Sequence, residues 1–378
     1  MRILMITDTV GGVWTYTREL VEGLLKARCK VTLVTMGRAP SPEQSSWSER
    51  ISNAYPSAFR LVPTRYKLEW MQEYANCYFE SRDLLLQLVD SFRPDLIHSN
   101  QFCYGALPVD IPRIVVAHSD VLSWLQCCRP EAPASHNDST WLINYVDLVS
   151  AGLRSATALV APTRWMLNSL EQNYTVPKWS AIIPNGRDIR RLTARSRKLQ
   201  AITAGRLWDE AKNISILESV HTSLPILVAG EAELDGEASL TSRGLHLLGP
   251  LRQDELLTLM AESSIYIATS CYEPFGLAPL EAALSGCAIV ANDIPSLREV
   301  WDDAAIYFKN ARGLARILTD LSNDPQRLHG MAERAFHRAT KNYTADAMTV
   351  SYLNLYRNAA STHYSTTYDD ELGRRHAS

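Results

Sequence analysis

The sequence lacks any long hydrophobic run and any strong excess of charge of one sign. Within its 378 residues no apolar run approaches the roughly 20 residues that a membrane-spanning helix needs, so we expect no transmembrane segment. The apolar stretch near the amino terminus is far shorter than the core of a signal peptide, and we therefore expect a cytoplasmic protein. The net charge of −3 provides no basic field over the whole molecule, which argues against nucleic acid as a partner.

Paired cysteine motifs are also missing. The seven cysteines are odd in number and form no Cys-x-x-Cys motif, so their spacing supports neither a metal site nor a redox site. We interpret most of them as small buried apolar residues in a reducing compartment. They are Cys29, Cys77, Cys103, Cys127, Cys128, Cys271 and Cys287.

The G-x-G-x-x-G fingerprint of dinucleotide-binding proteins is absent, which disfavours a nicotinamide-dependent dehydrogenase. In its place, Gly11 and Gly12 stand between the first expected strand and a helix. Paired glycines let the backbone approach a ligand closely, and a helix N-terminus favours an anion. Taken alone, the two glycines are also consistent with a simple turn.

What the chain does contain is a regular alternation of short β-branched runs and longer amphipathic segments. This alternation predicts parallel, doubly wound α/β sheets, and the length of the chain favours two domains. The expected strands lie at 2–7, 30–35, 95–99, 113–118, 156–162, 180–184, 199–205, 225–230, 244–249, 264–269 and 287–292.

A polar, basic segment at 185–198 interrupts this alternation, and we interpret it as a linker. We therefore predict an N-terminal Rossmann-like domain at 1–190 and a C-terminal one at 191–344. A final helix with apolar residues at helical spacing is expected at 345–360, followed by a weakly ordered tail at 361–378.

Two stretches of the N-terminal half show no clear periodicity. Residues 38–66 combine proline, serine and aromatic residues, and 127–138 is similarly irregular. We expect loops in both places, because insertions of this length in a compact fold are often lids or binding loops.

Two cations follow the expected strand at 199–205. Arg206 comes directly after the strand, and Lys212 lies six residues further on, near the next helix. Arginine can bind phosphate oxygens through two parallel hydrogen bonds, and lysine supplies a compact positive charge. The pair is a candidate diphosphate clamp, although two solvated surface cations would give the same pattern.

The segment "EPFGLAPLE" (273–281) follows another expected strand, at the edge where α/β proteins bind ligands. Its Pro-Phe-Gly sequence predicts a turn, followed by a helix N-terminus whose N–H groups point into a cleft. The carboxylates of Glu273 and Glu281 suit sugar hydroxyls, which donate hydrogen bonds. Glu281 could instead be a favourable charge near a helix N-terminus, whereas Glu273 lies in the loop before it.

Two histidines also end expected strands. His118 ends the strand at 113–118, where a polar residue at the ligand edge suggests a functional role. A hydrogen-bonded structural histidine would give the same pattern. For His98, within the strand at 95–99, we favour the structural interpretation.

The segments "VGGVWTY", "IPNGRD", "AGRLWDEAKN" and "YEPFGLAPLEAALSGCAIVAND", taken in order, resemble the retaining glycosyltransferases of sequence family 4. The resemblance spans roughly residues 1–358, and its most specific part is the E-x7-E motif from Glu273 to Glu281. It implies the GT-B fold, in which two Rossmann-like domains face a cleft that binds a nucleotide sugar.

The resemblance also implies a role for each matched residue. Arg206 and Lys212 would neutralise the diphosphate, Glu273 would bind the hydroxyls of the donor sugar, and Glu281 would bind those of the ribose. His118 matches the active-site histidine near the sugar and the acceptor. The last helix would pack back on the N-terminal domain. Further groups facing the donor are expected at Gly11, Gly12, Phe275, Gly276 and Leu277.

The implied reaction moves a hexose from a nucleotide-diphosphate sugar, with UDP favoured over GDP, to an acceptor hydroxyl. Retention is expected from front-face attack, in which the departing phosphate accepts the proton of the acceptor. No Asp-x-Asp motif follows a strand, so we expect no essential metal ion, and the nucleotide sugar is a co-substrate rather than a cofactor. Two departures from the family pattern, at 231–236 and in "IPSLRE" (294–299), leave the choice of donor open.

The acceptor would bind to the N-terminal domain, where aromatic residues are frequent. They either pack in the core or form an apolar site, so that the acceptor could be a sugar, a lipid-linked sugar or a small aromatic aglycone. The helix expected at 69–92 has few basic residues, so we expect the protein to associate with membranes loosely at most. The aromatic residues are Trp14, Trp47, Tyr55, Phe59, Tyr66, Trp70, Tyr74, Tyr78, Phe79, Trp124 and Trp141.

Two further functions fit parts of the pattern. A sugar-nucleotide 2-epimerase, an isomerase with the same fold, is the main alternative, and the E-x7-E motif favours transfer over it. A non-catalytic sugar-binding subunit is disfavoured because the two cations and both carboxylates are present.

Overall fold

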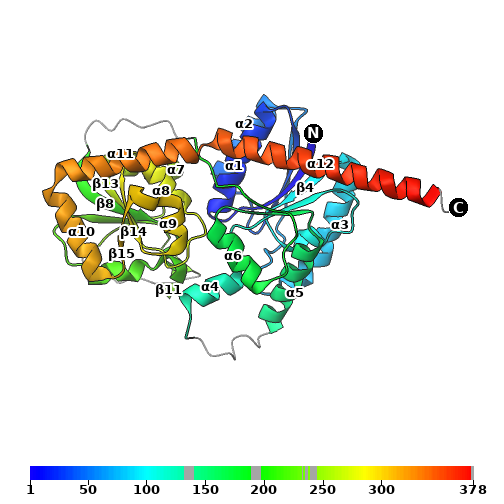
Figure 1. Cartoon of the computed structure of the whole chain (residues 1–378). Coiled ribbons are helices and arrows are strands. Elements are labelled where there is room, and N and C mark those ends of the chain that lie inside the picture. Colours follow the sequence, from blue (N-terminus) through cyan, green and yellow to red (C-terminus); the bar gives the residue numbers. More distant parts are fainter. Residues whose placement is uncertain (132–139, 189–196, 232, 235–236, 239–244, 376–378) are drawn as a thin grey trace.

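The computed structural model describes residues 1–131, 140–188, 197–231, 233–234, 237–238 and 245–375. Parts of the predicted linker, of the irregular stretch at 127–138 and of the segment at 231–236 lie outside these residues. The two halves of the chain form separate lobes, each built around its own sheet, and the last part of the chain returns from the C-terminal lobe to the N-terminal lobe (Figure 1).

The N-terminal sheet has seven parallel strands in the order β3-β2-β1-β4-β5-β6-β7. Alternate residues of the central strand pack on opposite faces: Ile3 and Met5 contact one buried cluster, and Leu4 and Ile6 another. A strand covered on both faces reads as a continuous apolar run, as observed at the amino terminus. The strands are β1 (Arg2–Asp8), β2 (Lys30–Met36), β3 (Phe59–Pro63), β4 (Leu96–Ser99), β5 (Arg113–Val116), β6 (Ala158–Ala161) and β7 (Ser180–Ile182).

Six α-helices belong to the described part of this lobe, and the loops before them carry several of the candidate site residues. They are α1 (Gly12–Lys26), α2 (Pro42–Ala54), α3 (Tyr74–Phe92), α4 (Val121–Cys128), α5 (Thr140–Ser155) and α6 (Arg164–Asn173), with a short 3-10 turn η1 (Cys103–Ala106).

The C-terminal sheet has six parallel strands in the order β12-β9-β8-β13-β14-β15. They are β8 (Lys198–Ala204), β9 (Ile226–Ala229), β12 (His246–Gly249), β13 (Ser263–Ala268), β14 (Ala288–Asn292) and β15 (Ala305–Phe308). Its helices are α7 (Gln253–Glu262), α8 (Leu277–Leu284), α9 (Pro295–Trp301), α10 (Ala311–Asn323) and α11 (Pro325–Asn342). Smaller elements are η3 (Glu210–Lys212), η4 (Ile214–Ser219), η5 (Asp302–Ala304) and the pair β10 (Glu233–Leu234) and β11 (Glu237–Ala238).

The two parallel sheets confirm the predicted α/β class, and every expected strand is present. The prediction of an irregular stretch at 38–66 is wrong, because this stretch contains α2 and the edge strand β3. Helix α2 begins with a capping box, in which Ser41 and Gln44 bond reciprocally and Pro42 takes the first helical position. Few of its residues are apolar, so periodicity did not reveal it. Strand β15 was also missed.

After α11 the chain passes from the C-terminal lobe to the N-terminal lobe, where helix α12 (Ala345–Arg375) packs against α1 (Figure 1). A Cβ atom on Gly23 would lie only 2.1 Å from the Thr349 hydroxyl, so this close packing requires glycine. The helix continues beyond the predicted end at 360, and residues 361–375 extend it where a weakly ordered tail was expected.

Candidate active site

The carboxyl ends of the two sheets face one another, and the candidate residues come from loops on both sides. A Cβ atom on Gly11 would lie 3.7 Å from Nη1 of Arg206, and one on Gly12 would lie 3.4 Å from Cδ1 of Leu277. The glycine turn of the N-terminal lobe therefore lies directly against the Arg206 side chain and the first residue of α8. Side chains at these glycines would fill the space in which a phosphate could approach the backbone.

Lys212 and Glu273 form an ion pair (Nζ–Oε2 2.6 Å) in the C-terminal lobe. Ser270 also donates to Oε2 of Glu273 (3.0 Å), and the stem of Lys212 packs over Gly205, at 3.4 Å from a Cβ atom built there. Both contacts to Glu273 fall on one oxygen, and Oε1 accepts no hydrogen bond from the part of the chain that the structure describes. Glu273 is thus fixed in orientation while one oxygen stays available to a ligand.

Gly276 is the N-cap of α8 and has a φ of +89°, a conformation that favours glycine. A Cβ atom there would lie 3.2 Å from Cγ of Glu273, so the turn also needs glycine for space. Phe275 turns its ring into the core, edge-on to Tyr343 at 5.3 Å between centroids. Only its backbone therefore remains for the predicted donor contact.

Glu281 is buried one turn into α8 and binds Arg187 (Oε1–Nη2 2.8 Å). Arg187 also forms an ion pair with Glu19 of α1, and both Glu281 and Arg187 have only 6% of their side-chain surface exposed. The pairing of Arg187 with Glu281 was not predicted from the sequence, although Arg187 lies in the segment "IPNGRD". The ion pairs of Arg187 with Glu19 and Glu281 therefore join α1, α8 and the segment between the lobes.

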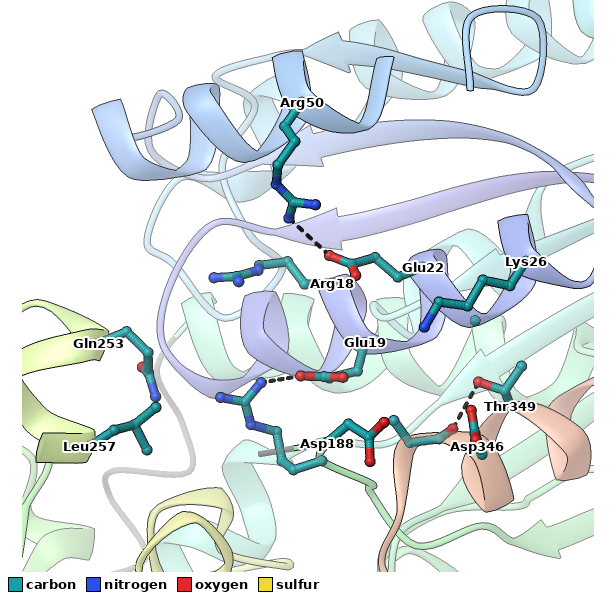
Figure 2. A pocket seen from close by; sticks show the side chains of 13 residues that line it. Arg18, Glu19, Glu22, Lys26, Arg50, Asp188, Gln253, Leu257, Asp346 and Thr349 are labelled. Atoms are coloured by element: carbon teal, nitrogen blue, oxygen red, sulfur yellow. Dashed lines mark hydrogen bonds and ion pairs between the residues drawn. The ribbon is translucent and has the colours of Figure 1, made fainter. Parts of the chain in front are cut away.

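A cavity of about 490 Å³ opens beside this ion-pair cluster (Figure 2). Four basic and four acidic side chains line it, so their formal charges cancel. Arg206, Lys212 and Glu273 do not line it, and the cavity is therefore separate from the cluster around Glu273. The charged lining residues are Arg18, Lys26, Arg50, Arg187, Glu19, Glu22, Asp188 and Asp346.

His118, just after β5, belongs to a hydrogen-bonded network that reaches α12. The amide nitrogen of Asn100 donates to the carbonyl of Ile6 (3.0 Å), which leaves the amide oxygen of Asn100 as an acceptor. This oxygen accepts from Nε2 of His118 (2.8 Å) and of His98 (3.2 Å). Nδ1 of His98 in turn accepts from the Tyr356 hydroxyl (2.5 Å). Because Nε2 of His118 carries the proton, its Nδ1 has a lone pair for a ligand hydroxyl.

Both histidines are neutral at physiological pH. Burial, together with the smaller effect of the nearby His98, lowers the pKa of His118 to about 3. Burial lowers the pKa of His98 to about 4, and this buried histidine, with hydrogen bonds to the side chains of Tyr16, Asn100 and Tyr356, confirms the structural interpretation. His118 can therefore orient a hydroxyl, but it offers no positive charge to a diphosphate.

The loop that carries Glu273 is attached to the N-terminal lobe. The Tyr272 hydroxyl accepts from the backbone N–H of Asp120 (2.9 Å) and from the Ser119 hydroxyl (3.2 Å). Thr163 donates to the carbonyl of Pro274 (2.9 Å). Residues next to His118 thus contact residues next to Glu273. No pattern in the sequence predicted these contacts.

Asp8 ends β1 beside the glycine turn and was not singled out from the sequence. Its Oδ1 accepts from the backbone N–H of Val10 (2.7 Å). Burial raises the pKa of Asp8 to about 7, and the Val10 N–H and the charge of Arg206 oppose this rise. The Asp8 carboxyl therefore changes charge near neutral pH, close to one of the two candidate phosphate-binding cations.

The aromatic residues of the N-terminal lobe differ in how far they are buried. Trp47, Phe59 and Tyr74 are buried in hydrophobic clusters, which supports the packing interpretation for them. Trp70 and Phe79 are 40% and 60% exposed and remain available to an apolar partner. None of the helices in the described ranges has the length and apolar character required to traverse a lipid bilayer.

Known families match two adjoining parts of the chain. Residues 10–191 match the model described as Glycosyltransferase Family 4, and residues 189–338 match the model described as Glycosyl transferases group 1. The glycogen synthase of Mycobacterium tuberculosis (strain CDC 1551 / Oshkosh) is 22% identical over 400 residues, which cover 94% of each chain.

Solved structures share the fold over almost the whole chain. Sucrose-phosphate synthase from Thermosynechococcus elongatus has a TM-score of 0.76 at 16% identity, covering 96% of this chain and 100% of that one. Anabaena Alr3699/HepE in complex with UDP-glucose has a TM-score of 0.68 at 18% identity, covering 97% and 100%.

Together with the two family matches, the two parallel α/β lobes identify a glycosyltransferase of the GT-B fold. The chain belongs to glycosyltransferase family 4, and it transfers a sugar from a nucleotide-sugar donor.

Proposed function

We propose that the protein transfers a hexose from a UDP-sugar to a hydroxyl-bearing acceptor, with retention of the anomeric configuration and without an essential metal ion. The observation that carries the proposal is the Lys212–Glu273 ion pair, which lies close to Gly205 and so to Arg206, whose side chain packs against the glycine turn. Support for uridine comes from the Anabaena protein of the same fold, which is in complex with UDP-glucose.

The leaving diphosphate would lie between the two lobes. Arg206 holds its guanidinium against Asp209 (2.7 Å) and lies close to Gly11 of the opposite lobe. Lys212 adds a second positive charge from η3. Preorganised charges stabilise the diphosphate as its negative charge grows in the transition state, and they need no rearrangement at that moment.

The two glutamates would bind different parts of the donor. Oε1 of Glu273 accepts from hydroxyls of the sugar, while Lys212 and Ser270 hold its other oxygen. Glu281 accepts from the ribose hydroxyls, and Arg187 fixes its carboxylate. His118 binds a hydroxyl of the sugar or acceptor through Nδ1. No side chain acts as a covalent nucleophile, and the departing phosphate accepts the proton of the acceptor.

A thermal-shift panel of UDP-, GDP- and ADP-sugars tests the donor, because ligand binding to the native state raises the melting temperature. We expect UDP-hexoses to raise it most, and a larger shift with GDP- or ADP-sugars contradicts the uridine assignment. Incubation with the donor alone separates transfer from epimerisation. An epimerase converts the donor without an acceptor, whereas a transferase gives only slow hydrolysis until an acceptor is added.

A further inference from the structure

We infer that Cys128 and Cys271 form a thiol pair that a low-molecular-weight disulfide oxidises to a disulfide bond between the two lobes. Cys128 is the last residue of α4, and Cys271 lies in the loop after β13. Their sulfur atoms are 3.6 Å apart, although the two residues are 143 positions apart in the sequence. Both side chains are partly exposed, whereas Cys29, Cys103 and Cys287 are buried.

The backbone around the two thiols is held in place from both lobes. Cys271 donates its backbone N–H to the carbonyl of Ala211 (2.9 Å) in η3. Next to this contact, Arg129 binds Glu210 through two hydrogen bonds (2.9 and 2.5 Å), and Trp124 donates to Asp209 (3.3 Å). These contacts keep the end of α4 against the loop of Cys271, so the thiols meet repeatedly in the native state.

A disulfide bond is about 2.05 Å long, so the sulfur atoms must approach by about 1.5 Å. Rotation of the two short side chains can supply much of this approach because neither is packed in a core. Cys127, the neighbour of Cys128, is also partly exposed and is the obvious competing partner.

The pair is chemically asymmetric. The contact between the two thiols lowers the pKa of Cys271 and raises that of Cys128, which favours Cys271 as the thiolate and Cys128 as the hydrogen-bond donor. The Cys271 thiolate therefore attacks one sulfur of an oxidant such as oxidised glutathione, forming a mixed disulfide and releasing one glutathione thiolate. Cys128 then loses its proton to solvent and attacks the Cys271 sulfur, which releases the second glutathione. The protein loses two electrons and two protons, and the oxidant is reduced to two thiols.

The bond would fasten the donor-binding loop to the opposite lobe. Cys271 is two residues before Glu273, and its hydrogen-bonding partner Ala211 precedes Lys212. Enzymes that close around a substrate must open again to release products. Oxidation would then slow turnover by holding the lobes together. This consequence rests on the proposed function, whereas formation of the bond does not.

The test of the bond uses the full-length protein and no substrate. After incubation with oxidised glutathione, thiol titration is expected to fall from seven to five, and peptide mass spectrometry to find residues 128 and 271 in one cross-linked peptide. Dithiothreitol should restore all seven thiols. Cys128→Ser and Cys271→Ser should abolish the cross-link, and Cys127→Ser, the matched control, should retain it. A Cys127–Cys271 cross-link, or stable glutathione adducts without any cross-link, overturns the inference.

The consequence is tested separately by sugar transfer before and after oxidation. We expect at least a tenfold fall in turnover for the wild type and Cys127→Ser, reversed by dithiothreitol, and no change for Cys128→Ser. Equal turnover of the reduced and cross-linked proteins overturns the locking of the lobes. Absence of transfer in the reduced protein would count against the proposed function. Peptide mass spectrometry would still detect the cross-link in that case.

Discussion

Arg187 and Glu281 form a buried ion pair (Nη2–Oε1 2.8 Å) at the junction of the two lobes. Arg187 stands in the segment that leaves the N-terminal sheet, and its backbone N–H donates to Tyr343 (3.0 Å) just before α12. Through Glu19 the same guanidinium reaches α1. Arg187 thus links a candidate ribose-binding carboxylate, through its side chain, to the second chain crossing between the lobes, through its backbone.

Removal of Arg187 should be strongly destabilising. Arg187→Ala leaves the buried Glu19 and Glu281 carboxylates without their cation, and breaking a buried pair in this way costs about 3–5 kcal/mol. Urea unfolding measures the loss. The control is Arg50→Ala, because Arg50 is 60% exposed in its pair with Glu22 and such pairs contribute about 0–1 kcal/mol. Equal losses in the two variants would contradict the role of Arg187.

Lys212→Ala should reduce kcat about 100- to 1,000-fold, the effect of losing one preorganised group that stabilises transition-state charge. Arg206→Ala should act in the same direction. Steady-state kinetics with the identified donor measure both. Lys198→Ala is the control, since Lys198 is 63% exposed and pairs only loosely with Glu262 (3.6 Å). Wild-type kinetics in Lys212→Ala or Arg206→Ala would rule out the diphosphate clamp.

Gly276→Ala should lower both stability and donor affinity. The new Cβ atom meets Glu273 at 3.2 Å, and the positive φ adds a strain of about 1–2 kcal/mol. Gly249→Ala is a matched control, because Gly249 also has a positive φ (+69°) but no atom within 4 Å of the added Cβ. Calorimetric titration with the donor should show weaker binding only for Gly276→Ala. If both variants bind the donor equally well, Gly276 does not position Glu273.

His118 should make the stability of the protein depend on pH. The folded pKa of about 3 lies below the ordinary value of 6.5, so between these values the unfolded chain binds a proton that the native chain does not. Stability is therefore lost as the pH falls from 6.5, by up to about 1.4 kcal/mol per pH unit. Urea unfolding at pH 4 to 7 should show a shallower dependence for His118→Ala. Parallel curves would mean that His118 is not held neutral.

The same His118→Ala variant tests the functional role. Because His118 is neutral, turnover in the wild type should show no ionisation of this residue between pH 5 and 8. The variant should lose turnover through poorer orientation of a sugar or acceptor hydroxyl. Turnover close to wild type at saturating donor and acceptor would assign His118 a purely structural role, like that of His98.

Much of the fold was predictable because its signals are local. β1 and β13 are buried on both faces, and such strands appear in the sequence as short apolar runs between amphipathic helices. Strand β3 and helix α2 were not predicted because an edge strand and a mostly polar helix produce only weak hydrophobic periodicity. The end of α12 was placed too early because its apolar spacing fades after 360.

The candidate site, like the fold, was predictable from the sequence only where its signals are local. Arg206 and Lys212 are six residues apart, and Glu273 and Glu281 are eight apart, so each pair forms a local pattern at a strand end. The sequence by itself determined the α/β class and these two patterns. Only the tertiary structure paired Lys212 with Glu273, Arg187 with Glu281, and Cys128 with Cys271. Periodicity records which face of an element is buried, but which side chains then meet depends on how the elements and the two lobes pack together.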